Sequence, residues 1–214
     1  MTPTITVINY DAGNLYSVLR GLKACGVVPK IVSDPAELQS CDSMILPGVG
    51  AFPKGMERLR ESGLSEAILD RVRQGAHLLG ICLGAQLLME WSEEFGHSEG
   101  LGIVSGGVVK LQPEAGYKVP HVGWAPLHKK RSWDKTILSS CRDEEFFYFN
   151  HSFICEPSDP QIRLAATNYG DVEFTAAFSV DGVTGIQCHP ELSSAPGIDV
   201  LKQFVNASTP DLSR

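Results

Sequence analysis

The sequence predicts an α/β fold in which a mixed, mostly parallel central sheet is flanked by helices and the second half is rich in strand. Over about the first hundred residues, short apolar runs alternate with amphipathic stretches, the pattern of βα units around a parallel sheet. Beyond them, Asp181-Gly182 and the cluster Phe146–Phe149 are typical of hairpins and strands. The length of 214 residues with 43% hydrophobic residues allows one sizeable core.

Local patterning predicts the elements in order. Thr4–Asn9 is a short apolar run and predicts a buried strand. After the turn at Gly13-Asn14, apolar residues at i, i+3, i+4 and i+7 predict a helix that ends near Gly26. We expect further strands at Val27–Val32, Ser43–Leu46, His77–Ile81 and from Val183, a short helix starting at Asp34-Pro35, and helices over Leu83–Trp91 and Ile198–Val205. Because neither a flexible linker nor a repeat interrupts this order, residues 1–214 are predicted to form a single domain.

Composition argues against several classes of function. The formal charge of −7 lacks the cationic surface that non-specific binding to nucleic acid or to an anionic membrane requires. No apolar run approaches the roughly 18 residues of a membrane span, and the N-terminal stretch lacks the basic segment of a signal peptide. Six cysteines without a C-x-x-C pair suggest reduced thiols in the cytoplasm. The histidines lack the paired spacing of metal ligands, so no metal is expected.

The segment Gly80–Gly84 lies where a predicted buried strand turns into a helix. This is the context of a nucleophile elbow, with Cys82 in the place of the usual serine. The glycines allow a tight turn, and the start of the helix favours a thiolate and supplies backbone N–H groups for an oxyanion. The alternative interpretation is a buried cysteine between two packing glycines.

A second candidate constellation is His189-Pro190-Glu191, which follows the apparent strand from Val183. Alternation in an extended chain would put His189 and Glu191 on one face, so the carboxylate can accept the imidazole N–H and turn the other nitrogen toward a nucleophile. A lone histidine near a carboxylate is more often structural. Its occurrence together with a nucleophile elbow favours a catalytic base and its orienting carboxylate.

The loop Pro47–Phe52 carries a third signal, the glycine pair Gly48 and Gly50 after a predicted strand. Its amides could supply a second oxyanion donor at the carboxyl ends of the parallel strands. A simple strand-to-helix turn or a phosphate-binding nest are the alternatives, although the loop lacks the Lys and Ser or Thr of a P-loop. It also lacks the third glycine and later acid of a dinucleotide fold, and no cofactor is expected.

Taken together, the Gly80–Gly84 and His189–Glu191 motifs resemble those of the class I (triad) glutamine amidotransferases. Within them, the chain from about residue 5 to about residue 205 is similar to the family of glutaminase subunits of imidazole glycerol phosphate synthases. The segments that carry this closer resemblance are Gly13-Asn14-Leu15, Pro47–Phe52, Pro120–Trp124, Tyr148-Phe149 and His151–Phe153. The resemblance implies a flavodoxin-like, class I glutamine-amidotransferase-like fold.

The resemblance also implies a reaction. Cys82 would attack the side-chain amide of glutamine, His189 would relay the proton to the departing ammonia, and Glu191 would orient His189. The oxyanion would be held by the backbone N–H of Leu83 and, after a rotation, by the Val49–Gly50 peptide.

By the same resemblance, glutamine would be bound and its ammonia passed to a partner. The substrate-binding residues would be Gly50, Gln86, Glu94, His151, Ser152 and Phe153, with Glu94 holding the α-ammonium group. The partner in the implied heterodimer is a (β/α)8-barrel cyclase, which makes imidazole glycerol phosphate and an aminoimidazole carboxamide nucleotide in histidine biosynthesis. Asn14, His121, Trp124 and Tyr148 would face it.

Three positions depart from the family pattern and keep other functions open. Leu192 stands where lysine is usual, Ala125 where asparagine is usual, and Phe153 where tyrosine is usual. One alternative is a glutaminase subunit of a different synthase, for example in amidino-sugar synthesis. A catalytically idle scaffold is another, and a third is a cysteine hydrolase acting on peptides or small aldehydes, which would not need the His189–Glu191 motif.

Overall fold

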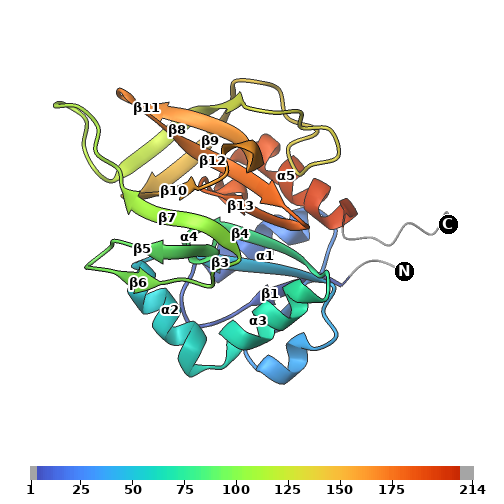
Figure 1. The fold of residues 1–214 in the computed structure, drawn as a ribbon. Helices are drawn as coiled ribbons and strands as arrows, with labels where there is room; N and C mark the ends of the chain where they lie inside the picture. The colour runs from blue at the N-terminus through green and yellow to red at the C-terminus, as the bar shows by residue number, and fades with distance from the viewer. Residues whose placement is uncertain (1–3, 208–214) are drawn as a thin grey trace.

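One large sheet takes strands from both halves of the chain in the computed structural model, which describes residues 4–207 (Figure 1). Residues 1–3 and 208–214, which the single-domain prediction includes, lie outside the described part. The strands are β1 (Thr6–Ile8), β2 (Lys30–Val32), β3 (Ser43–Gly48), β4 (His77–Cys82), β8 (His121–Lys129), β9 (Glu145–His151), β11 (Arg163–Tyr169), β12 (Val172–Val180) and β13 (Val183–Ile186). Their order in space is β2-β1-β3-β4-β13-β12-β11-β8-β9.

The sheet changes character at β13. From β2 to β13 neighbouring strands are parallel, whereas β12, β11, β8 and β9 are antiparallel to their neighbours. The central sheet is mixed, as predicted: the strands from the first half of the chain are parallel, and the second half is rich in strand. A second sheet in the order β10-β7-β5-β6 consists of β5 (Met89–Ser92), β6 (Ser98–Glu99), β7 (Val104–Lys110) and β10 (Phe153–Pro157).

Helices cover both faces of the parallel part (Figure 1). On one face lie α1 (Leu15–Ala24) and α5 (Ser194–Ala207), and on the other α2 (Phe52–Glu61) and α3 (Leu64–Arg73). Along β4, the side chains of Leu79 and Ile81 pack on the face covered by α1 and α5, whereas Leu78 packs on the face covered by α2 and α3. Because β4 is buried on both faces, its sequence carries no polar side chain from Leu78 to Ile81. Within residues 4–207, no helix combines the length and apolarity needed to span a bilayer.

Several boundaries differ from the predicted ones. The expected strands Thr4–Asn9 and Val27–Val32 are shorter, and the closing helix begins at Ser194 and not at Ile198. The expected short helix after Asp34 is present as the 3₁₀ turn Pro35–Leu38, in which the Asp34 side chain accepts the N–H of Ala36 over 2.9 Å. Two further 3₁₀ turns lie at Pro160–Ile162 and Pro190–Leu192.

The predicted helix over Leu83–Trp91 is wrong in its second half. Helix α4 (Leu83–Leu87) ends after five residues, and β5 begins at Met89. The Leu88 carbonyl accepts the N–H groups of Ile103 and Val104, and Trp91 pairs with Gly107 of β7. Pairing with a strand distant in sequence therefore overrides the helical spacing of the apolar residues.

The turn from β4 into α4 depends on very close backbone contacts. A Cβ atom on Gly84 would overlap the carbonyl oxygen of Leu46 in β3, and one on Gly80 would lie 2.8 Å from the backbone nitrogen of Ala85. The short helix can therefore sit directly on β3 and β4 only because these positions carry no side chain.

We expect Gly84→Ala to lower the free energy of unfolding by about 3 kcal/mol or more, because backbone must move to admit the methyl group. The matched control is Gly75→Ala, where φ is +88° but no atom lies within 4 Å of the added Cβ. Its cost is the left-handed backbone alone, about 1–2 kcal/mol. Urea unfolding followed by circular dichroism measures both, and equal losses would contradict this account of the turn.

Candidate active site

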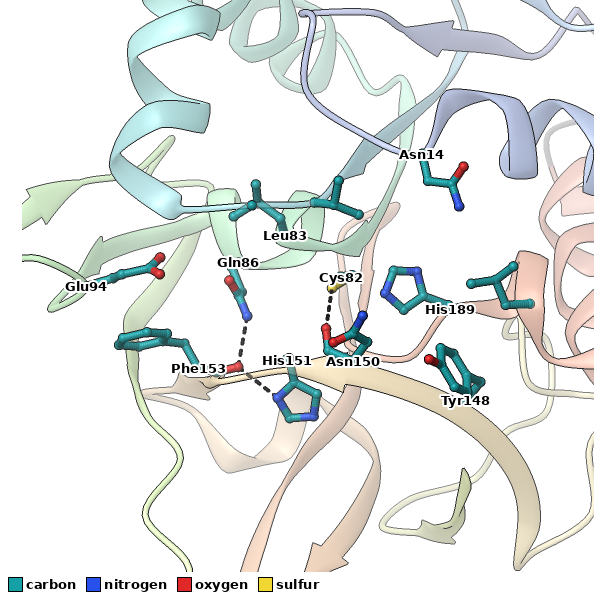
Figure 2. Close-up of a pocket in the computed structure, with 13 residues that line it drawn as sticks. Asn14, Cys82, Leu83, Gln86, Glu94, Tyr148, Asn150, His151, Phe153 and His189 are labelled. Atoms are coloured by element: carbon teal, nitrogen blue, oxygen red, sulfur yellow. Dashed lines mark hydrogen bonds between the residues drawn. The ribbon is translucent and has the colours of Figure 1, made fainter. Parts of the chain in front are cut away.

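The carboxyl ends of β3 and β4 border a cavity of about 250 Å³ (Figure 2). This edge of a parallel sheet is where α/β proteins commonly bind ligands. The volume is below the roughly 300–1,000 Å³ of drug-sized sites, so a small ligand fits best. The lining residues are Asn14, Val49, Gly50, Cys82, Leu83, Gln86, Glu94, Tyr148, Asn150, His151, Phe153, His189 and Leu192.

Cys82 occupies the predicted strand-to-helix turn. Its φ of 53° and ψ of −111° lie in a region that residues with a side chain rarely adopt. This sharp turn ends β4 and directs the sulfur into the cavity, as expected of a nucleophile elbow. The sulfur lies 3.8 Å from the backbone oxygen of Asn150, to which the thiol donates.

His189 and Glu191 form a buried pair beside Cys82. Nδ1 of His189 lies 2.8 Å from Oε1 of Glu191, so Nε2 is the ring nitrogen that can hydrogen-bond to the sulfur of Cys82. The expected extended geometry is wrong, because Pro190–Leu192 is a 3₁₀ turn, yet this turn still brings the two side chains together. The loop is anchored to β9: the backbone N–H of His189 donates to the carbonyl of Tyr148 over 2.8 Å, and the Tyr148 N–H donates to Ser193 Oγ over 3.0 Å.

Charge at this pair favours the protonated imidazole. Burial lowers the pKa of His189, but the adjacent Cys82 and Glu191 side chains raise it more strongly, and the net pKa is about 10. The second carboxylate oxygen of Glu191 is buried and accepts no hydrogen bond from residues 4–207. A histidine held between a sulfur and a carboxylate can take a proton from one reacting group and give it to another.

Glu94 marks the opposite end of the cavity (Figure 2). Its Oε2 accepts the backbone N–H of Phe52 over 2.7 Å, and burial raises the pKa of its carboxyl group despite this bond. The cavity lining contains no lysine or arginine side chain. The Glu94 carboxylate therefore suits a ligand that carries a cationic group at one end and its reacting atom, near Cys82, at the other.

Of the six predicted substrate-binding residues, five line the cavity. Gly50, Gln86, Glu94, His151 and Phe153 are brought together, whereas Ser152 does not line it. The carbonyl of Ser152 instead accepts the N–H of Leu111. Val49 and Leu83, the other predicted oxyanion residues, also line the cavity.

The four predicted interface residues divide into two groups. Asn14 and Tyr148 line the cavity, and Trp124 is 50% exposed with its ring 6.1 Å from that of Tyr148. The expectation that His121 faces a partner is wrong, because its side chain is 3% exposed and stacks on Tyr169 at 4.2 Å. Successive side chains of a strand point to opposite faces, so with Trp124 outside, His121 must point inward.

Two residues that received no role from the sequence also contact the site, the exposed Asn150 and the buried Gln187. Asn150 accepts the thiol proton of Cys82 through its carbonyl, and Gln187 is 2% exposed with its Nε2 3.8 Å from the same sulfur. The period of two counted back from His189 was the signal that could have placed Gln187 on the same side as His189. Backbone contacts such as that of Asn150 leave no sequence signal.

Metal ligation has no support in this part of the chain. No group of three or more His, Cys, Asp or Glu side chains among residues 4–207 is close enough together to hold an ion. The six cysteines, all within this range, are unpaired.

Residues 6–207 match the family model described as glutamine amidotransferase class-I. The chain is 41% identical over 204 residues to the imidazole glycerol phosphate synthase subunit HisH of Nostoc punctiforme, covering 95% of each chain. It is also 41% identical over 204 residues to the subunit HisH of Synechococcus elongatus, covering 95% of this chain and 93% of the relative.

Two solved structures share the fold at low sequence identity. PurLQS from Thermotoga maritima has a TM-score of 0.74 at 20% identity, covering 96% of this chain and 99% of that chain. The crystal structure of a glutamine amidotransferase has a TM-score of 0.73 at 19% identity, covering 95% and 98%. The predicted fold class is thereby confirmed.

The charge coupling in the site yields a titration prediction. Because the Cys82 side chain is one cause of the raised pKa of His189, we expect the imidazole in Cys82→Ser to release its proton at a lower pH than in the wild type. Histidine side-chain NMR, with the signal assigned through His189→Gln, measures the midpoints. Cys25→Ser is the control, since Cys25 does not line the cavity. Identical His189 midpoints in Cys82→Ser and wild type would refute the coupling.

Proposed function

The chain belongs to the class-I glutamine amidotransferase family, and on that premise we propose that it hydrolyses glutamine, with Cys82 as nucleophile, His189 as proton carrier and Glu191 as the group that orients it. The observation that carries the proposal is the nucleophile elbow facing the same cavity as a histidine bonded to a carboxylate at 2.8 Å. A cysteine, a histidine and a carboxylate are the residue types that can serve as nucleophile, as its base and as the group that orients the base.

The reaction divides into two steps. The thiol proton of Cys82 first passes to His189, and the resulting thiolate attacks the side-chain amide carbon. The protonated His189 gives this proton to the departing nitrogen, so that ammonia leaves and a glutamyl thioester remains. His189 then takes a proton from water, whose oxygen attacks the thioester carbon. The C–S bond breaks, the sulfur regains its proton, and glutamate is released.

Each step passes through an oxyanion that the turn regions can stabilise. We assign one donor to the backbone N–H of Leu83 and a second to the Val49–Gly50 peptide after rotation. Gly50 has φ of +103° and no atom within 4 Å of the position a Cβ would occupy, so its surroundings leave room for that rotation. Losing one such donor typically costs about 2.7–4 kcal/mol of transition-state stabilisation.

The lining, with the Glu94 carboxylate and no lysine or arginine, suits a ligand with a cationic group, which glutamine has in its α-ammonium group. We assign the α-ammonium group to Glu94, which lies at the end of the cavity away from His189. Gln86, His151, Phe153 and Gly50 would enclose the rest of the molecule, and Ser152 would act only through its backbone.

We propose that the ammonia passes to a (β/α)8-barrel cyclase that makes imidazole glycerol phosphate, in a cytoplasmic heterodimer, with residues 1–214 acting as one domain. Support comes from the relatives named as synthase subunits and from Trp124, Tyr148 and Asn14 at or beside the cavity. Leu192, where the resemblance leads us to expect lysine, lines the cavity and favours a different ammonia-consuming synthase as the second candidate acceptor.

We expect Cys82→Ala to abolish glutamate release, by at least about a thousandfold, because no other group can form the thioester. The complex with a candidate cyclase should still make product from added ammonia, since only the donor half is removed. Glutamate release and product formation are measured separately, with Cys25→Ala as the control that retains both. Residual glutamate release near the wild-type rate in Cys82→Ala would exclude Cys82 as nucleophile.

A second variant tests the docking face. Trp124→Ala should weaken the complex with the cyclase by about tenfold or more, because exposed aromatic side chains are frequent energetic centres of interfaces. The control is Val28→Ala, which is 89% exposed but precedes β2 at the amino edge of the parallel strands, opposite the cavity. Titration calorimetry measures both affinities. An unchanged affinity in Trp124→Ala would place the interface elsewhere.

A further inference from the structure

A line of buried hydrogen bonds runs beside the cavity and ends at Cys82. Nε2 of Gln86 donates to the carbonyl oxygen of Phe153 over 2.9 Å and to Oε1 of Gln187 over 3.1 Å. Nε2 of Gln187 in turn lies 3.8 Å from the sulfur of Cys82. Gln86 and Gln187 are 5% and 2% exposed, so water does not compete for these bonds.

The chemistry of the groups fixes the direction of this line. A backbone carbonyl can only accept, so the amide group of Gln86 must turn its nitrogen toward Phe153. That nitrogen carries two hydrogens, and the second is directed at Gln187, whose oxygen must therefore accept. The remaining group of the Gln187 amide is its nitrogen, so an N–H faces the sulfur.

The far end of the line strengthens this orientation. Nδ1 of His151 donates to the same carbonyl of Phe153 over 3.0 Å, and its Nε2 lies 3.3 Å from Nδ1 of His121. Burial lowers the pKa of His121 to about 4, and burial together with His121 lowers the pKa of His151 to about 3. Both rings are therefore neutral near pH 7. Because Nδ1 of His151 carries the proton that it donates to Phe153, its Nε2 accepts from Nδ1 of His121.

We propose that Gln187 is a positioning residue for Cys82, whose amide N–H holds the sulfur at the elbow and stabilises the thiolate formed when His189 takes the proton. The second neighbour of the sulfur, the carbonyl of Asn150, accepts a proton from the thiol but repels a thiolate. Gln187 is the contact that gains strength on ionisation, because hydrogen bonds to charged acceptors are roughly twice as strong as neutral ones. The inference rests on the proposed role of Cys82 as nucleophile.

The strand geometry explains how Gln187 and His189 act on the same atom. The backbone N–H of Gln187 donates to Ala176 of β12 over 2.8 Å, and that of His189 donates to Tyr148 of β9. The chain between them is therefore held at both ends. Two side chains two positions apart reach Cys82, one as an N–H donor and the other as the proton acceptor.

The test is the pH dependence of Cys82 alkylation by iodoacetamide. Cys82 is the only cysteine between Arg73 and Lys110, with no other basic cleavage site between them, so one tryptic peptide reports its modification. Gln187→Glu keeps the size of the side chain and an oxygen that accepts from Gln86, but replaces the N–H that faces the sulfur. We expect the midpoint of alkylation to rise by about one pH unit and kcat for glutamine to fall about tenfold, with KM within about twofold.

The matched control is Thr184→Val, a buried polar residue that bonds Ser179 and makes no contact with the sulfur. It should alter thermal stability while leaving the alkylation midpoint unchanged. Gln187→Met serves as a second variant that also lacks the N–H, should the glutamate variant fail to fold. If folded Gln187 variants keep the wild-type midpoint, the proposal is overturned and Gln187 is only a packing residue. Alkylation needs no glutamine, so a wild-type chain inactive on glutamine would count against the proposed function and leave this test intact.

Discussion

Everything in the site depends on how closely the start of α4 approaches β3 and β4. That approach needs bare backbone at Gly48, Gly80 and Gly84, because a Cβ on any of them would meet atoms within 3 Å. With the helix seated there, the chain must turn sharply at Cys82, and the sulfur is left at the carboxyl edge of the sheet. The absence of side chains at these three glycines thus determines the position of Cys82, and the other residues of the site are arranged around it.

The order of strands supplies the second requirement. Cys82 and His189 are about a hundred positions apart in the chain, yet β13 lies parallel to β4 with Ile186 opposite Ile81. β4 ends at Cys82 and β13 at Ile186, so the two neighbouring strands end at nearly the same level of the sheet. The loop that follows β13 therefore brings His189 close to Cys82. The antiparallel strands that follow in space carry Tyr148, Asn150 and His151 to the remaining side of the cavity.

Local signals accounted for the elements whose contacts are local. The βα alternation, the glycine-flanked cysteine and the cap at Asp34 were all readable in the sequence, and the pairing of His189 with Glu191 survived a wrong prediction of its backbone. What escaped prediction depends on partners distant in the chain. Leu83–Trp91 has helical spacing, but its second half pairs with β7; the burial of His121 follows from the direction of β8; and Gln187 gains its contact through Gln86. The proposed glutamine-binding positions came from family resemblance, because cavity lining contributed by several loops has no short-range pattern.

The backbone at Cys82 places the chemistry and the folding of this chain in opposition. Its φ of 53° is a conformation that glycine adopts freely, that any other residue adopts only with strain, and that β-branched residues adopt least well. On folding grounds alone, glycine would be the better residue at this position. The residue proposed to carry the reaction is thus one that the fold tolerates at a cost, an example of the trade-off between stability and activity that limits how far such an enzyme can be stabilised.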